Sequence, residues 1–266
     1  MNSTATLSSS AGPAPSDRTL EWIMRVGLAA CFIGHGSLGF LHQKAWTSYF
    51  GVVGIGPETA YTLMPWVGAF DLALAISVLI FPLRPIVLYM VAWTVWTALL
   101  RPLAGESVWE AVERAGNYGI PLALWLYLAV RSDEPMASPR REVLTWVLRL
   151  TTVLLLLGHG ALGLWVRKPL FATHYHSIGL PGDSLVPVVG AVECIFALAV
   201  LVRPNRWLLV GVLAWKLATE ALSPIAGSAI WVFVEHGGSY AAPLALALLL
   251  WRSQSAQAST PTPTVS

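Results

Sequence analysis

The residues best suited to proton chemistry in this chain are two histidines that each lie between glycines in an apolar segment. They occur in Gly34-His35-Gly36 and in Gly158-His159-Gly160. Imidazole titrates near neutral pH and can therefore accept or release a proton under physiological conditions. We predict that both histidines accept protons or bind a ligand. The next apolar segment after each histidine carries one acidic residue, and we expect these two to orient or charge-balance the imidazoles: Asp71 and Glu193.

A second polar motif lies further along the chain, where Glu113 to Tyr118 and Glu235 to Tyr240 share the pattern Glu-[Arg/His]-x-Gly-x-Tyr. We add Glu113 and Glu235 to the proton-accepting set and place both motifs at the mouth of a polar pocket. Aromatic and charged residues nearby are predicted to bind a ligand or cofactor: Trp93, Trp96, Arg101, Arg114, Tyr118, Trp215, Lys216, Glu220 and Tyr240.

The second half of the chain is richer in histidine, which raises the question of a metal. Alternate residues of an extended loop point to the same face, so His174 and His176 suggest, with His159 and His236, a site for zinc, copper or iron. A haem held between His35 and His159 is a further alternative. If only one of the two pockets is active, we expect it to be the second, around His159, because that pocket has more ligand-capable residues. The competing structural interpretation is that Gly-His-Gly serves close helix packing and that Lys216 and Glu220 only neutralise each other.

Composition places these residues in a membrane protein. Hydrophobic residues make up 56% of the 266-residue chain and charged residues 11%, against roughly 25% charged in soluble domains. A net charge of +2 without a basic cluster predicts no nucleic-acid partner. Dinucleotide-binding, P-loop, nucleophile-elbow and zinc-protease motifs are absent, which argues against soluble nucleotide or hydrolase chemistry.

The order of features predicts an all-α integral membrane fold with eight transmembrane helices. Residues from Trp93 to Pro121 align without a gap with Trp215 to Pro243, which indicates a tandem duplication. Four spans in each unit make the two repeats parallel. The expected spans cover residues 20–41, 61–81, 86–100, 118–130, 144–166, 184–201, 207–222 and 240–251.

Basic residues predict the orientation. Most arginines, including those of the central linker, fall on the side of both termini, so we expect both termini in the cytoplasm and the chain in the cell membrane. His35 and Asp71 would then lie about 8 to 10 Å inside the outer surface. The predicted divisions are a disordered tail (1–18), a first repeat (19–131), a linker (132–142), a second repeat (143–252) and a disordered tail (253–266).

Both units resemble the DoxX-like family of four-span membrane proteins. The residues that carry this resemblance are an arginine early in the first span, a lysine after it, a loop glycine, an acid in the second span and an arginine before the third: Arg25 and Arg149, Lys44 and Lys168, Gly54 and Gly179, Asp71 and Glu193, Arg84 and Arg203. The tandem arrangement, the Gly-His-Gly triplets and the Glu-[Arg/His]-x-Gly-x-Tyr motifs depart from the family pattern.

The resemblance implies a quinone-linked redox role in the lipid bilayer, with quinone as the expected cofactor and a partner redox subunit. Two alternatives stay open at this point. One is a non-catalytic haem- or metal-binding or scaffold subunit of a membrane redox complex. The other is a small-molecule transporter, which is disfavoured because no span shows the broken-helix pattern expected of a midplane site.

Overall fold

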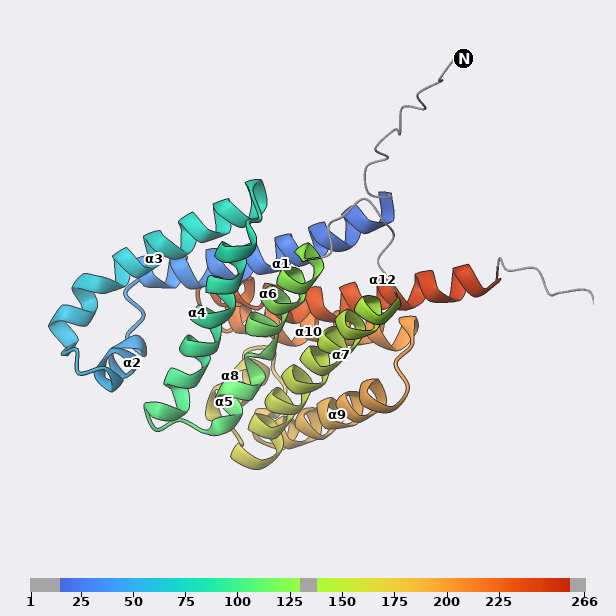
Figure 1. Ribbon diagram of the computed structural model, residues 1–266. Coiled ribbons are helices and arrows are strands. Elements are labelled where there is room, and N and C mark those ends of the chain that lie inside the picture. The colour runs from blue at the N-terminus through green and yellow to red at the C-terminus, as the bar shows by residue number, and fades with distance from the viewer. Residues whose placement is uncertain (1–14, 130–137, 259–266) are drawn as a thin grey trace, which may run out of the picture.

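The chain folds entirely into helices over the part that the computed structural model describes, residues 15–129 and 138–258 (Figure 1). Much of each predicted tail and of the linker falls outside these ranges. The helices are α1 (Pro15–Phe40), α2 (Trp46–Val52), α3 (Pro57–Ile80), α4 (Arg84–Leu103), α5 (Val108–Glu113), α6 (Ala115–Leu128), α7 (Ser138–Ala161), the π-helix η1 (Leu162–Val166), α8 (Pro169–His176), α9 (Gly182–Val202), α10 (Arg206–Ile225), α11 (Ile230–Glu235) and α12 (Gly237–Ala258).

Seven segments are long and apolar enough to cross a membrane, which supports a multi-pass membrane protein. They cover Arg18–Phe40, Pro57–Ile80, Arg84–Leu103, Pro139–Val166, Gly182–Val202, Arg206–Ile225 and Ile230–Trp251.

The eighth predicted span corresponds to α6, which is too short to be counted with them. Its 14 residues reach about 21 Å at 1.5 Å per residue, less than the roughly 30 Å of hydrocarbon. The chain before it turns at Arg114, and Glu110 and Glu113 precede that turn. The predicted span that begins at residue 118 therefore falls on α6 alone, and a turn and two glutamates separate it from α5.

Several predicted boundaries also move. Helix α1 begins at Pro15, inside the expected N-terminal tail, and α7 begins at Ser138, inside the expected linker. Helix α12 runs to Ala258, six residues past residue 252, where the second repeat was predicted to end. Stretches predicted as polar connections contain the short helices α2, α5 and α8.

The helices form an inner and an outer set. In the most apolar stretches of α1, α7 and the α11–α12 segment, 61%, 61% and 67% of residues are buried, against 22% to 33% for α3, α4, α9 and α10. Figure 1 shows α1, α6, α7 and α12 running through the middle of the molecule, with α3 and α9 toward opposite sides. The inner set is thus enclosed by protein, and the outer set offers apolar side chains to lipid.

Glycines allow the inner and outer helices to approach closely. A Cβ added at Gly36 in α1 would lie 2.7 Å from the carbonyl oxygen of Gly68 in α3, and one at Gly160 in α7 would lie 2.7 Å from that of Gly190 in α9. At the other ends of the same helix pairs, arginine side chains donate hydrogen bonds to backbone carbonyls. The guanidinium of Arg25 donates to the carbonyls of Val78 and Leu79 at the end of α3, with an Nε–O distance of 2.9 Å to Val78.

We predict that Gly36→Ala destabilises the protein, because the new methyl group must push α1 and α3 apart. Overpacking of this kind costs about 1–3 kcal/mol. The matched control is Gly51→Ala, since nothing lies within 4 Å of a Cβ at Gly51. The free energy of unfolding, measured by titrating SDS into mild-detergent micelles, should fall for the first variant and stay level or rise for the second.

Candidate functional site

The first histidine belongs to a hydrogen-bonded triad assembled from three helices. The fully buried carboxylate of Asp71 (α3) lies 2.6 Å from Nδ1 of His35 (α1) and accepts a hydrogen bond of 3.0 Å from Nε1 of Trp93 (α4). The imidazole stacks on Trp46 of α2, with 4.4 Å between ring centroids. A carboxylate only accepts, so the proton of the neutral imidazole sits on Nδ1 and the lone pair on Nε2.

The second histidine belongs to a corresponding triad. Oxygen Oε2 of Glu193 (α9) lies 2.6 Å from Nδ1 of His159 (α7), and Oε1 accepts from Nε1 of Trp215 (α10) at 3.2 Å. Here the imidazole stacks on Phe171 of α8 at 4.6 Å. The aligned histidines, acidic residues and tryptophans thus make corresponding contacts in both halves.

A large cavity opens beside the first triad. It has a volume of about 1040 Å³, at the upper end of the ~300–1,000 Å³ typical of ligand sites. Six of the residues predicted from the sequence line it: His35, Trp93, Trp96, Arg101, Arg114 and Glu235. Its walls come from α1, α2, α3, α4, α5, α6, η1, α8, α10 and α11, so both halves of the chain contribute.

The corresponding space in the second half is filled by an ion pair. Lys216 is buried, and its Nζ lies 2.7 Å from Oε1 of Glu220 and 3.5 Å from Oε1 of Glu193. The aligned residues in the first half, Thr94 and Ala98, line the cavity. Sequence reasoning favoured the second pocket for its ligand-capable residues; two charged side chains of that half, Lys216 and Glu220, lie where the first half has the cavity-lining Thr94 and Ala98.

The two Glu-[Arg/His]-x-Gly-x-Tyr motifs contact each other across the two halves of the chain. Arg114 forms an ion pair with Glu235, and Nε2 of His236 lies 3.2 Å from Oε1 of Glu113. The backbone of Glu235 packs on Gly34, and that of Glu113 packs on Gly158. Each Gly-His-Gly turn of helix is therefore covered by the short helix of the other half. Tyr118 and Tyr240 do not line the cavity; Tyr118 packs against the core, and Tyr240 donates to the carbonyl of Phe233 at 3.0 Å.

The histidines predicted to bind a metal do not converge. His174 and His176 lie in a helix, α8, where two residues apart means about 200° around the axis. The expectation of an extended loop, with both side chains on one face, is therefore wrong. His176 instead faces Asp183, at 3.7 Å, on the exposed surface. Burial lowers the pKa of His174, which favours its neutral form.

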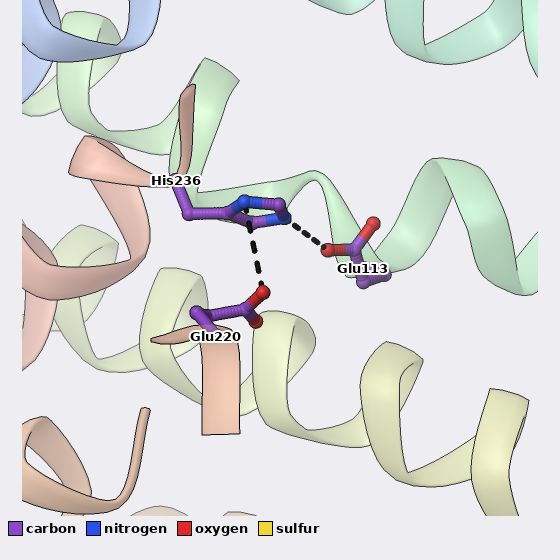
Figure 2. A group of neighbouring side chains, drawn as sticks. All are labelled: Glu113, Glu220 and His236. Carbon is purple, nitrogen blue, oxygen red and sulfur yellow. Dashed lines mark hydrogen bonds and ion pairs between the residues drawn. The ribbon is translucent and has the colours of Figure 1, made fainter. Parts of the chain in front are cut away.

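Among the described residues, ligand-type spacing of three groups is found at Glu113, Glu220 and His236 (Figure 2). Each carboxylate already contacts a cation, since Lys216 contacts Glu220 and Nε of Arg114 lies 3.2 Å from Oε2 of Glu113. These contacts describe an ion-pair cluster. The haem alternative stays a prediction; the imidazoles of His35 and His159 stack on Trp46 and Phe171 of their own halves.

Sequence reasoning predicted Arg101 but missed the polar residues around it at the mouth of the cavity. The hydroxyl of Tyr49 donates to Glu106 at 2.5 Å, and Nη1 of Arg101 lies 3.2 Å from Glu106 and 3.4 Å from Glu110. Lys168, from the second half, completes the cluster at 2.7 Å from Glu110. Burial raises the pKa of Tyr49, and its bond to Glu106 adds to the shift while Arg101 opposes it. Tyr49 therefore remains a neutral donor.

Comparison with known proteins finds no matching family model, curated protein or solved structure. Functional inference for this chain accordingly depends on the geometry of the described residues. The resemblance to the DoxX-like family stays a prediction.

We predict that Arg114→Gln lowers the free energy of unfolding by about 3–5 kcal/mol, because it leaves buried carboxylates without their cation. Adding Glu235→Gln should recover part of the loss, since the double variant buries one fewer charge. The comparison variant is Arg140→Gln at an exposed position. Equal effects of the two arginine variants in SDS titrations would show that the Arg114–Glu235 pair is not stabilising.

Proposed function

We propose that this chain is a DoxX-like membrane protein that binds quinol in the cavity beside His35 and takes part in its oxidation. The observation that carries the proposal is the His35–Asp71–Trp93 triad at the wall of a cavity of about 1040 Å³. Aromatic side chains that include Trp46, Trp93 and Trp96 line that cavity, as a planar head group requires.

The triad supports proton acceptance from a hydroxyl. Asp71 holds the proton of His35 on Nδ1, which leaves the Nε2 lone pair available to the cavity that His35 lines. A base fixed in one tautomer and one orientation by a buried carboxylate is the arrangement that general-base catalysis uses. Oxidation of a quinol releases two protons and two electrons. We assign the first proton to His35, the second to water at the mouth of the cavity and the two electrons to a partner redox subunit.

The rim of the cavity favours an amphipathic ligand. Several lining residues are also exposed on the outside of the protein and are apolar: Leu41, Val53, Trp96, Val166 and Leu170. In a bilayer such side chains face hydrocarbon. A ligand with a polar ring and an apolar tail could therefore place its ring against His35 and its tail in the lipid.

The same proposal includes the membrane arrangement. We infer two parallel repeats of a four-helix unit, with the short α6 in the place that α12 takes in the second repeat. The corresponding triads support this, as do the arginines Arg25 and Arg149, which both donate to carbonyls at the end of a neighbouring helix. We infer a location in the cell membrane with both termini in the cytoplasm, from the distribution of arginines. The cavity then opens on the outer side.

A second candidate function is the transport of a small molecule. Sequence reasoning disfavoured it for lack of broken helices, but the chain turns at Arg114 between α5 and α6 and at His236 between α11 and α12. Broken helices at charged residues are typical of transporter binding sites. The two candidates differ in what the cavity must do, since a transporter has to open it to the other side of the membrane.

We predict that His35→Gln weakens binding of a decyl-substituted benzoquinol at least tenfold, because the amide cannot act as a base at the position of Nε2. Binding is measured by quenching of tryptophan fluorescence in proteoliposomes, since Trp46 and Trp93 line the cavity. The matched control is His42→Gln, at an exposed position close to the end of α1.

His159→Gln should change quinol affinity less than about threefold, because the ion pair of Lys216 and Glu220 fills the space beside it. Equal losses in the His35 and His42 variants would contradict a quinol site at the first triad. Uptake of a radiolabelled solute by proteoliposomes without quinol binding would favour the transporter instead.

A further inference from the structure

The aligned positions Arg114 and His236 hold a permanent and a titratable cation in the same structural place. Each follows a glutamate, each ends a short helix, and each reaches a carboxylate of the other half. Arginine remains protonated in proteins, whereas histidine can lose its proton near neutral pH. The two halves therefore differ in whether this charge can be removed.

We propose that His236, held between Glu113 and Glu220, is a proton-storage site that is coupled to the cavity through Glu113, Arg114 and Glu235. The coupling to quinol rests on the function proposed above. The stored proton itself does not, because it follows from the contacts of the ligand-free protein.

Hydrogen-bond geometry requires a proton in this cluster. Nitrogen Nδ1 of His236 lies 2.7 Å from the carbonyl oxygen of Val232, which can only accept, so Nδ1 carries a proton. Nitrogen Nε2 lies 3.2 Å from Oε1 of Glu113, and this contact needs a second proton on the imidazole or on the carboxyl. Figure 2 shows the ring lying between the two glutamates.

The charges of the surrounding residues also favour a proton in this cluster. Four buried carboxylates, those of Glu113, Glu193, Glu220 and Glu235, face two permanent cations, Arg114 and Lys216. Subtracting two from four leaves two negative charges to be balanced. Uncompensated buried charge is costly, and the histidines in contact with these carboxylates, His159 and His236, can each supply one positive charge.

The contacts between His236 and the cavity are continuous. Glu113 is shared between His236, at 3.2 Å, and Nε of Arg114, also at 3.2 Å, and Arg114 forms an ion pair with Glu235. Arg114 and Glu235 both line the cavity. The titratable and charged groups around His236 are Glu113 and Arg114 from α5 and its end, Lys216 and Glu220 from α10, Glu235 from α11, and His159 and Glu193 beyond Glu220.

A neutral quinol adds no net charge to the cavity, but its hydroxyl can donate to His35 only when Nε2 carries no proton, so quinol binding favours the neutral imidazole of His35. Loss of that positive charge beside Glu235 and Arg114 strengthens retention of the proton on His236. His236 should therefore oppose the proton release that His35 gives on quinol binding. A variant that removes the contribution of His236 alone is therefore needed.

The test uses His236→Arg, which copies Arg114 of the first half, with His236→Gln as a second variant and the exposed His176→Gln as control. One coupled proton makes the dissociation constant of decyl benzoquinol change by up to about tenfold per pH unit. We expect the slope of log Kd against pH to steepen by up to one in both His236 variants and to stay unchanged in the control. An unchanged slope in folded His236→Arg protein would overturn the coupling.

A direct measurement on the ligand-free protein separates this proposal from the quinol assignment. In ¹⁵N-histidine NMR, with the His236 resonances identified by their absence in His236→Gln, we expect an imidazolium at neutral pH. A neutral His236 would refute the stored proton even if quinol binds. A divalent metal ion bound stoichiometrically in wild type and lost in Glu220→Gln would also refute it, because the metal would then balance the charge.

Discussion

Carboxylates buried inside a bundle of apolar helices constrain most of this structure. Asp71 and Glu193 are fully buried, and a bare carboxylate in such surroundings costs several kcal/mol. Each one is compensated by a histidine from the preceding inner helix and a tryptophan from the following outer helix. These hydrogen bonds hold three helices at one level, and Gly36 and Gly160 permit the close approach that they require.

The same requirement makes the two halves depend on each other. Glu113 and Glu235 are also buried, and each contacts a basic side chain of the opposite half, Glu113 in addition to its neighbour Arg114. A single half would lose these contacts, so the exchange stabilises the folded chain as a whole. It also brings Arg114 and Lys168 together around one cavity, although they come from different halves.

Periodic and compositional signals predicted the helical membrane fold, the pairing of each histidine with the acid of the next span, and the polar level that they share. Those signals predicted eight spans, whereas seven segments are long and apolar enough to cross a membrane, since α6 with its 14 residues is too short to be counted. Residues such as Tyr49 and Glu106 carry no motif. They meet only because α2 and the turn before α5 fold over the same opening.

The two halves differ because two aligned positions, four residues apart on one helix, carry different side chains. Thr94 and Ala98 are small and leave the cavity open, whereas Lys216 and Glu220 fill the equivalent space with charge. Glu220 then needs more positive charge than Lys216 provides, because Lys216 also contacts Glu193. His236 lies within 3.7 Å of Glu220 and can meet that need by holding a proton. Closing one pocket with an ion pair thereby creates the titratable cluster beside the other.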